Sequence, residues 1–564
     1  MAGEQATDGA AAGFDELGRR VIDPESARRW LEAGWWPTTT MLDDFRAVVA
    51  ATPDRPAVVS YRQGEPLPVT FTYGQLGAIV DRFAGALLEL GIDKGDVVSM
   101  QLPNSWEFPA LAYSVLAVGG VVNPLVPIFR HRELSFILER TASKALFVPR
   151  TFRGFDHGEL AARLVGELPE LRHAFVVGGE PPAGARSFEE FFVARRWEDQ
   201  PGLRGALEAR KPSPDDLVEI QFTSGTTGEP KGVLHDHRTV WASGRAINAT
   251  LGLTADDTCF MASTLAHQTG FLFGLSGPLG RGNKVVYQDI WDAPTALRIF
   301  DAERVVWTVS ATPFVVDLIN AQQDVGASLD SFRYFVCGGA PIPPHVVSDA
   351  AEALDVELVA VWGMTENGIV TATAPGSPIE VVANSDGIPV PWMELRVVDD
   401  DDVELPVGES GHLQVRGPNQ TLGYFKRPDV YRASSTADGW FDTGDLARRR
   451  EDGGIRISGR AKDLVIRGGE NVPVAEVENV LYTHPKVKEL AVVGVPDERL
   501  GERACAVVVP EDEADPPTLA QLVRHLDEHG MAKQYWPERL EVVVAMPRTP
   551  SGKIQKFLLR ERFG

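Results

Sequence analysis

The sequence predicts an α/β protein with a large N-terminal domain and a small C-terminal domain, and three observations carry that prediction. With 564 residues, the chain is longer than a single hydrophobic core usually serves. Short apolar runs alternate with amphipathic stretches over most of its length, which is typical of parallel sheets covered by helices. Near residue 386 this rhythm changes to Gly- and Pro-rich segments with short alternating strands.

The large domain contains two successive series of expected strands. The first series covers 97–102, 120–124, 145–148 and 174–177, and the second covers 259–262, 284–287, 305–309, 334–337 and 358–361. Helical stretches separate the strands, for example at 131–140, 293–301 and 343–353. Two such series predict two stacked α/β subdomains.

The expected domain boundaries follow from composition. Residues 1–25 begin with an Ala- and Gly-rich stretch without an apolar run, so we expect a flexible tail and no secretory signal. Residues 26–461 form the N-terminal domain, in which the short strands at about 386–459 predict a small antiparallel β-barrel. Residues 462–564 combine strand and helix patterns, which predicts a small α+β domain.

Charge and cysteine content restrict the class of protein. The chain has 55 Lys and Arg against 79 Asp and Glu, a net charge of −24, which is the opposite of what a general nucleic-acid binder needs. Cys259, Cys337 and Cys505 are far apart and lack metal-ligand spacing, which favours a reduced, cytoplasmic setting. We therefore expect small-molecule partners and no nucleic acid.

The apolar stretch at 110–129 is about long enough to cross a bilayer. Gly119-Gly120, Pro124 and Pro127 interrupt it, however. A buried helix near 106–118 followed by a strand is the favoured interpretation, and no membrane span is expected. The oligomeric state stays open, with a homodimer as one candidate.

The most informative segment runs Thr223-Ser224-Gly225-Thr226-Thr227-Gly228-Glu229-Pro230-Lys231-Gly232, directly after an expected strand at 218–222. Hydroxyl groups and backbone N–H groups in such a loop can surround phosphate oxygens, and glycine lets the backbone approach them closely. The segment lacks the Gly-Lys pair of the GxxxxGK[ST] loop. A flexible polar turn would explain the Gly and Thr residues but not the whole string, so a phosphate-binding loop is favoured.

This decapeptide resembles the phosphate loop of the adenylate-forming superfamily, which includes acyl-CoA synthetases, peptide-synthetase adenylation domains and luciferases. The resemblance extends from about residue 45 to the C-terminus, because further family motifs follow in order. These are Gly338-Gly339-Ala340-Pro341, Trp362-Gly363-Met364-Thr365-Glu366, Asp442-Thr443-Gly444-Asp445, Gly459-Arg460-Ala461-Lys462-Asp463 and Pro550-Ser551-Gly552-Lys553. Several local strings are similar to cyclohexanecarboxylate–CoA ligases and to short- and medium-chain acyl-CoA ligases.

The resemblance implies that the N-terminal domain adenylates a carboxylic acid with ATP and Mg²⁺, and it implies roles for individual residues. The nucleotide contacts would come from Thr223, Ser224, Gly225, Thr226, Thr227, Gly228, Lys231, Gly338, Gly339, Ala340, Trp362, Gly363, Met364, Asp445, Ile457 and Arg460. Glu366 and Thr226 would hold the metal. Lys553, His267, Thr365 and Glu366 would be the catalytic residues.

The chemistry explains why such residue types are needed. A carboxylate attacks the α-phosphorus of ATP and pyrophosphate leaves, so the site must supply positive charge and hydrogen-bond donors to anionic reactants. Lys553 is a mobile ammonium that suits contact with the carboxylate and the α-phosphate. Magnesium commonly uses one or two protein carboxylates, which suits Glu366, although a helix N-terminal Glu is the alternative interpretation. Asp445 is an acceptor-only group that suits the ribose diol.

The second half-reaction would transfer the acyl group to the thiol of coenzyme A. The resemblance implies that a mobile C-terminal domain swings about Lys462 after adenylation, and that Gly468 and Gly469 line the passage for pantetheine. Residues 531–564 hold seven Lys or Arg against three Glu, which would suit the phosphates of coenzyme A. A separate carrier protein is the alternative acceptor.

The acid itself is expected to be small and apolar. His267 resembles the aromatic gate beside the substrate carboxylate, and no nearby acidic residue matches those of amino-acid-activating relatives. The segments expected to line the pocket, at 267–273, 310–314, 338–340 and 367–369, look small or apolar. We therefore expect an alicyclic, aromatic or short- to medium-chain acid. A luciferase-like monooxygenase and a non-catalytic nucleotide-binding module are the remaining alternatives.

Overall fold

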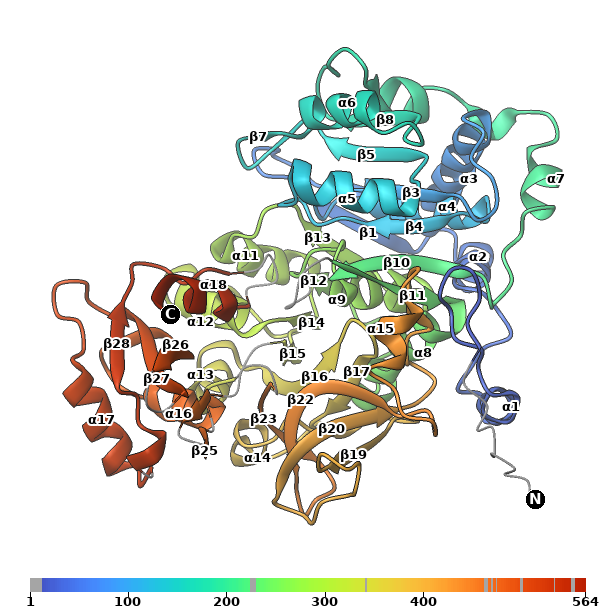
Figure 1. Ribbon diagram of the computed structural model, residues 1–564. Coiled ribbons are helices and arrows are strands. Elements are labelled where there is room, and N and C mark those ends of the chain that lie inside the picture. The colour runs from blue at the N-terminus through green and yellow to red at the C-terminus, as the bar shows by residue number, and fades with distance from the viewer. Residues whose placement is uncertain are drawn as a thin grey trace, which may run out of the picture.

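The structure is a computed structural model that describes residues 13–223, 230–339, 342–460, 465–467, 470–472, 474–497, 501–531, 533–548 and 553–564. Among these residues the two largest sheets have nine and eight strands. The two sheets lie one above the other, with the C-terminal elements beside them (Figure 1). The prediction of two stacked α/β subdomains is therefore confirmed.

The nine-stranded sheet carries most of the motifs that follow residue 330. Its strand order is β18 (Ile388–Pro389), β17 (Gly368–Ala372), β16 (Glu357–Met364), β15 (Tyr334–Gly338), β14 (Trp307–Ser310), β12 (Cys259–Met261), β13 (Val285–Gln288), β1 (Pro56–Tyr61) and β2 (Val69–Thr72). Strands from β16 to β1 pair in parallel, and the pairs at both edges are antiparallel.

The eight-stranded sheet carries the strands on either side of the phosphate-loop segment. Its order is β21 (Gly423–Tyr424), β11 (Lys231–Asp236), β10 (Leu217–Thr223), β4 (Val121–Pro124), β3 (Val97–Met100), β5 (Ala145–Pro149), β8 (His173–Val177) and β9 (Arg186–Ser187). The strands from β10 to β9 pair in parallel, whereas β11 pairs antiparallel with both β10 and β21.

Helices cover both sheets in the described part of the chain. They are α1 (Pro24–Glu32), α2 (Met41–Ala51), α3 (Tyr73–Glu89), α4 (Glu107–Ala117), α5 (His131–Thr141), α6 (His157–Glu167), α7 (Leu203–Glu208), α8 (His237–Leu251), α9 (Gln268–Phe271), the π-helical η3 (Leu272–Ser276), α10 (Gly277–Leu279), α11 (Ala293–Glu303), α12 (Thr312–Val325), α13 (Pro344–Leu354), α14 (Ile379–Ala383) and α15 (Pro428–Arg432). Side-chain caps begin several of them: Thr72 and Gln75 form a capping box at α3, and Asp236 accepts from the Thr239 amide at 2.8 Å to begin α8.

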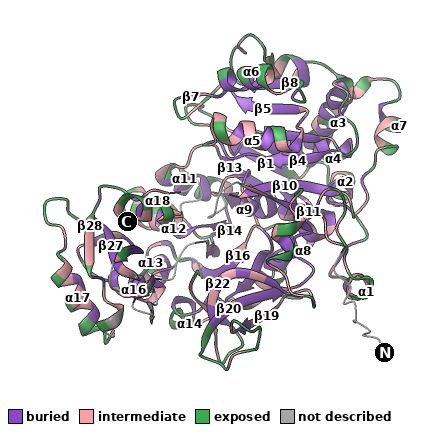
Figure 2. Ribbon diagram, viewed as in Figure 1, coloured by how far each residue is buried: buried purple, intermediate pink, exposed green. Residues whose placement is uncertain are grey.

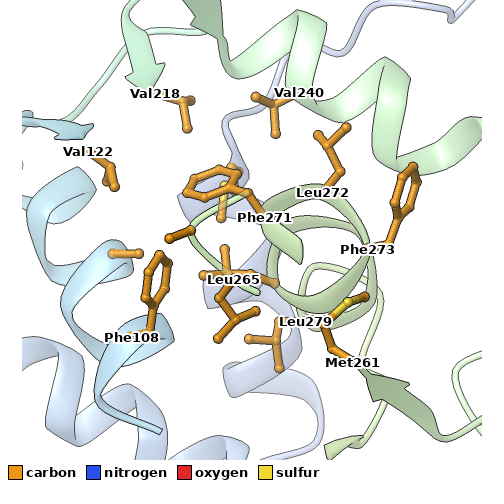
Figure 3. Close-up of a cluster of buried hydrophobic side chains, with 14 of the residues drawn as sticks. Phe108, Val122, Val218, Val240, Met261, Leu265, Phe271, Leu272, Phe273 and Leu279 are labelled. Carbon is orange, nitrogen blue, oxygen red and sulfur yellow. The ribbon is translucent and has the colours of Figure 1, made fainter. Parts of the chain in front are cut away.

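The segment from α9 to α10 lies between the two subdomains. Phe271 and Leu272 pack among side chains of both, including Val218 of β10 and Met261 of β12 (Figure 3). The central strands of both sheets are buried, and exposed faces occur on outer helices such as α6 (Figure 2). One continuous core therefore fixes the two sheets relative to each other.

The apolar stretch at 110–129 is interior structure. Its helix α4 is buried along its whole length, Gly119 adopts φ = +75°, and β4 follows. No helix in the described part of the chain is both long enough and apolar enough to cross a membrane.

Two smaller units follow the α/β sheets. Strands β19 (Glu394–Val398), β20 (Ser410–Arg416), β22 (Phe441–Arg449) and β23 (Ile455–Arg460) pair antiparallel in that order where a small barrel was expected. The C-terminal sheet has the order β25 (Glu470–Val472), β24 (Val465–Arg467), β27 (Gly501–Pro510) and β26 (Val487–Asp497), with β28 (Arg539–Val542) also on β27. It packs with α16 (Val474–Leu481), α17 (Leu519–Glu528) and α18 (Lys556–Phe563), which confirms the predicted α+β unit.

Packing at the N-terminus begins near residue 13, inside the stretch 1–25 that was expected to be a flexible tail. The ring of Phe14 packs against Tyr431 at 5.9 Å, and the Arg20 backbone N–H donates to the Leu422 carbonyl at 2.7 Å. Residues 13–25 are therefore attached to the domain, because they bury apolar side chains and pair with β21. Residues 1–12 lie outside the described part.

Candidate active site

The motif residues gather where parallel strands end, as ligand sites in α/β folds do. Thr223 ends β10, Gly338 ends β15 and Met364 ends β16. Thr223 pairs with Lys231 across β10 and β11, so the two ends of the phosphate-loop segment are held together. The residues between them, Ser224, Gly225, Thr226, Thr227 and Gly228, lie outside the described residues, as do Ala340, Lys462, Gly468 and Gly469.

Glycines bring backbones together at this edge. A Cβ atom on Gly338 would lie 2.6 Å from the Val361 carbonyl oxygen, and one on Gly363 would lie 2.0 Å from that of Gly368. Both distances are shorter than real Cβ contacts allow, so a side chain at either position would force the strands apart. Met364 packs partly buried against the core beside them.

Lys553 of the C-terminal domain lies against Gly339 of the N-terminal domain. A Cβ atom added to Gly339 would be 3.4 Å from Cε of Lys553, and Gly339 has φ = +81°. Burial lowers the pKa of Lys553, the nearby charge of Arg460 adds to this, and Asp445 and Glu366 oppose it. The structure thus brings one C-terminal lysine within electrostatic range of three charged motif residues.

Asp445 is held from two sides. The Trp362 indole N–H donates to Oδ2 at 2.9 Å, and Nε of Arg460 lies 2.9 Å from Oδ1. Asp445 and Arg460 are directly opposite in the β22–β23 ladder, which explains their ion pair. Burial raises the pKa of Asp445, and Arg460 offsets part of that rise. Each carboxylate oxygen has a second lone pair, so the group can still accept from a diol.

Ile457 places the strand that carries Arg460. Its backbone N–H donates to Oδ2 of Asp386 at 2.7 Å, and its side chain packs against the main core. The described structure therefore gives Ile457 a packing role beside the predicted nucleotide site.

Glu366 is buried and fixed by two contacts from the segment around β21. The Tyr424 hydroxyl donates to Oε1 at 2.8 Å, and the Glu366 carbonyl accepts from the Thr421 amide at 2.6 Å. The Lys231 ammonium lies 5.1 Å from the Tyr424 ring centroid. A carboxylate, a phenol and an ammonium therefore meet where the phosphate loop returns to the sheet.

Thr365 precedes Glu366 and is held from β11. Its carbonyl accepts from Nε2 of His235 at 2.8 Å. Burial lowers the pKa of His235 to about 4, so the ring is neutral at pH 7. The carbonyl groups of Thr365 and Glu366, which follow the end of β16, are thus both held by residues from other parts of the chain.

His267 caps α9. Its Nδ1 accepts from the Thr269 amide at 3.4 Å. Burial lowers the pKa of His267 to about 4, and the charge of Lys553 contributes to the shift. The neutral ring and the ammonium therefore border one region. Binding of the acid's carboxylate there stays a prediction.

The donor set suits a nucleoside triphosphate with a magnesium ion. Lys231, Lys553 and Arg460 supply positive charge, and Asp445 supplies an acceptor. The described residues contain no group of three His, Cys, Asp or Glu that could cage a metal ion. Glu366 would hold magnesium together with phosphate oxygens, which is the ion's common mode in phosphoryl-transfer sites. The other predicted ligand, Thr226, lies outside the described residues.

Sequence reasoning did not find His235, Thr421 or Tyr424. Their roles depend on contacts with Thr365 and Glu366 across 130, 55 and 58 positions of the chain. A histidine inside the apolar strand at 231–236 was the one available signal. Gln268 and Asn367 fall in two segments expected to line the acyl pocket, 267–273 and 367–369, but those segments were expected to be small or apolar, so the two amides were not singled out.

Comparisons with known proteins agree with this geometry. The family model of the AMP-binding enzymes matches residues 45–425, and that of their C-terminal domain matches residues 476–553. The chain is 36% identical over 530 residues to the medium-chain fatty-acid–CoA ligase of Escherichia coli (strain K12), covering 94% of this chain and 91% of that protein. It is 32% identical over 539 residues to the 2,3-dihydroxybenzoate-AMP ligase of Bacillus subtilis (strain 168), covering 95% and 96%.

Among solved structures, the anthranilate CoA ligase AuaEII in complex with anthranoyl-AMP superposes with a TM-score of 0.81 at 25% identity, covering 94% of this chain and 98% of that one. Family models, curated relatives and solved structures therefore point to one group of enzymes. The chain belongs to the AMP-binding enzyme family, within the adenylate-forming superfamily, and is an ATP-dependent ligase that forms acyl adenylates.

Proposed function

We propose that the protein is an AMP-forming acyl-CoA ligase that activates a small carboxylic acid with a largely apolar frame. The observation that supports this most strongly is the position of Lys553, which reaches from the C-terminal domain to Gly339, within electrostatic range of Asp445 and Glu366. A mobile positive charge at that place is what two anionic reactants need in order to approach each other.

In the first half-reaction a carboxylate oxygen of the acid bonds to the α-phosphorus of ATP, and the bond from that phosphorus to pyrophosphate breaks. Lys553 neutralises the carboxylate and an α-phosphate oxygen. Asp445 accepts from the ribose hydroxyls, and Arg460 stays on Asp445 or turns to the phosphates. Lys231 and the Thr365–Glu366 segment hold the leaving phosphates, and magnesium supplies charge neutralisation there.

In the second half-reaction the thiol sulfur of coenzyme A bonds to the acyl carbon, the bond to AMP breaks, and the thiol proton passes to solvent. Lys553 fills the site in the present arrangement, so the C-terminal domain has to move before a thiol enters. We place the boundary at residues 461 and 462, with Lys462 as the hinge and Gly468 and Gly469 along the entry route.

The proposal that coenzyme A, and not a carrier protein, accepts the acyl group is supported by the similar proteins and not by the charge of the C-terminal surface. Three of the seven cations in the stretch 531–564 pair with carboxylates of the C-terminal domain: Arg539 pairs with Glu541, Arg548 with Glu489, and Lys556 with Glu478. Two of the three proteins named above are CoA ligases. The third is an AMP ligase, which keeps loading of a carrier protein as the alternative.

The deciding assay measures AMP and pyrophosphate release with ATP, magnesium and coenzyme A across a panel of linear, alicyclic and aromatic acids. The proposal predicts stoichiometric acyl-CoA and AMP with at least one acid. ATP–pyrophosphate exchange that never consumes coenzyme A would favour the carrier protein. Absence of both exchange and AMP with every acid would contradict the proposal.

A further inference from the structure

A group of buried polar side chains without hydrogen-bond partners lies beside His267 and Glu366. Glu219, Ser243 and Asn367 are fully buried, and Gln268 is 3% exposed. Within the described residues, both carboxyl oxygens of Glu219, both side-chain polar atoms of Gln268 and of Asn367, and Oγ of Ser243 have no hydrogen-bond partner of good geometry. We call these four residues the polar cluster.

Contacts among four elements connect the polar cluster. The Gln268 amide on α9 faces the Glu219 carboxyl on β10 as a hydrogen-bonding neighbour, which lowers the pKa of Glu219 against the larger effect of burial, although the contact falls short of good hydrogen-bond geometry. A Cβ atom on Gly368, next to Asn367, would lie 2.7 Å from Oγ of Ser243 on α8. The same atom would lie 3.2 Å from Cδ1 of Leu272, one helical turn after Gln268. The cluster therefore occupies the space between α8, α9, β10 and the β16–β17 turn.

The surroundings of the polar cluster are otherwise apolar. Val218, Val240, Phe271 and Leu272 pack together at this level of the core (Figure 3). Buried polar groups in proteins are nearly always hydrogen-bonded, because an unpaired one loses its hydration without compensation. Seven unpartnered atoms on four neighbouring side chains therefore indicate a partner that is a ligand or a group of internal waters.

The chain places this partner next to the reacting groups. Gln268 directly follows His267, which borders Lys553, and Asn367 directly follows Glu366. Burial raises the pKa of Glu219 to about 8, so its carboxyl is mainly uncharged at pH 7. The polar cluster then consists of two amides, one hydroxyl and one carboxyl, all of them uncharged.

We propose that the polar cluster is the polar part of the acyl pocket and selects a carboxylic acid whose apolar frame carries an uncharged hydrogen-bonding substituent, a hydroxyl or a keto oxygen. This inference rests on the proposed acid-activating function. It narrows the purely apolar acid that sequence reasoning predicts, because amides and hydroxyls would be left unpaired against a hydrocarbon. A second carboxylate is disfavoured, because the polar cluster offers no positive charge to offset the loss of its hydration.

The test compares matched acids that differ in one substituent. ATP–pyrophosphate exchange gives kcat/KM for cyclohexanecarboxylate, its hydroxy and oxo derivatives, benzoate, the three hydroxybenzoates and the three (aminomethyl)benzoates. The wild type should prefer at least one hydroxy or oxo acid over its unsubstituted parent by about tenfold or more, since a site built around hydrogen bonds rejects the partner that lacks them. The ratio within one preparation is independent of the fraction of folded enzyme.

Two isosteric variants locate the effect. Gln268→Met and Asn367→Leu remove the amides while keeping the side-chain size, and each should reduce the preference ratio at least about fivefold. Asn123→Leu is the matched control: Asn123 of β4 is also a buried amide with an unpartnered Oδ1, and its Nδ2 donates to Ser99 at 2.7 Å. That variant should leave the ratio unchanged.

Three results would overturn the inference. One is a higher kcat/KM for the unsubstituted acid in every pair. Another is an equal loss of kcat/KM for both acids of a pair in Gln268→Met and Asn367→Leu, which would mean that the polar cluster binds internal water and no part of the acid. A preference for the (aminomethyl)benzoates alone would mean that Glu219 is ionised and binds an ammonium. If no acid supports exchange at all, the proposed function fails instead, so the two failures are distinct.

Discussion

Nε2 of His235 donates a hydrogen bond of 2.8 Å to the carbonyl oxygen of Thr365. A carbonyl can only accept, so Nε2 carries the proton, and Nδ1 is left to accept from the Thr239 hydroxyl at 3.1 Å. β11 begins at Lys231, at the end of the phosphate-loop segment. One short strand therefore sets the distance between the phosphate loop and the Thr365–Glu366 motif.

Replacing His235 should impair adenylation more than thiol transfer. His235→Leu removes the donor to Thr365, and the displaced motif should lower kcat for pyrophosphate exchange about tenfold or more. His235→Gln places an amide N–H near the position of Nε2 and should keep most of the rate. Acyl transfer from pre-formed acyl-AMP to coenzyme A is the internal control, and equal losses in both half-reactions would show that His235 acts only on stability.

Removing the Tyr424 hydroxyl should weaken the binding of magnesium during the reaction. The hydroxyl orients Oε1 of Glu366, and outer groups of this kind typically contribute about tenfold or more to metal affinity. Tyr424→Phe keeps the ring beside Lys231, so the magnesium concentration for half-maximal exchange should rise about tenfold. An unchanged magnesium requirement would separate Tyr424 from the metal.

Glu219 makes stability depend on pH in one direction. Burial raises its pKa to about 8, above its ordinary value of 4.5. Between those two values the unfolded chain loses a proton that the folded chain keeps, so this group lowers stability as pH rises toward 8 and changes little above that. A tenfold difference in proton affinity between the folded and unfolded chain corresponds to about 1.4 kcal/mol of folding free energy.

Glu219→Gln should remove that pH dependence. The variant's urea midpoint should exceed that of the wild type at pH 8, and the difference should shrink steadily as the pH falls to 5. Glu476, a glutamate paired with Arg448 at the surface, provides the control substitution Glu476→Gln, for which we expect no comparable trend. A pH-independent difference for Glu219→Gln would mean that Glu219 is ionised in the fold.

The sequence predicts the α/β layers well because their signals are local. The glycines and prolines that interrupt the apolar run at 110–129 indicate a helix and a strand by themselves, and α4 and β4 follow that pattern. Lys553 and Asp445 are found through motifs whose order along the chain is informative. Both kinds of evidence need only neighbouring residues.

The remaining features depend on contacts between distant parts of the chain. His235 looks like one polar residue in a buried strand until the fold brings Thr365 to it, 130 positions later. Gln268 and Asn367 lie in segments that the sequence assigns to a small or apolar pocket lining, and only the fold shows that their buried amides lack well-formed hydrogen bonds within the described residues. The N-terminal stretch at 13–25 looks like a tail because its partner, the segment around β21, lies some 400 positions away.

The most direct test of the account measures the two half-reactions separately in the variant Lys553→Ala. The lysine reaches the N-terminal motifs only for adenylation, so the variant should lose pyrophosphate exchange by about 100-fold or more while transferring pre-formed acyl-AMP to coenzyme A at close to the wild-type rate. Lys556→Ala, which removes a lysine paired with Glu478 in the same domain, should leave exchange intact. Undiminished exchange in Lys553→Ala, or an equal loss in both half-reactions, would contradict the account.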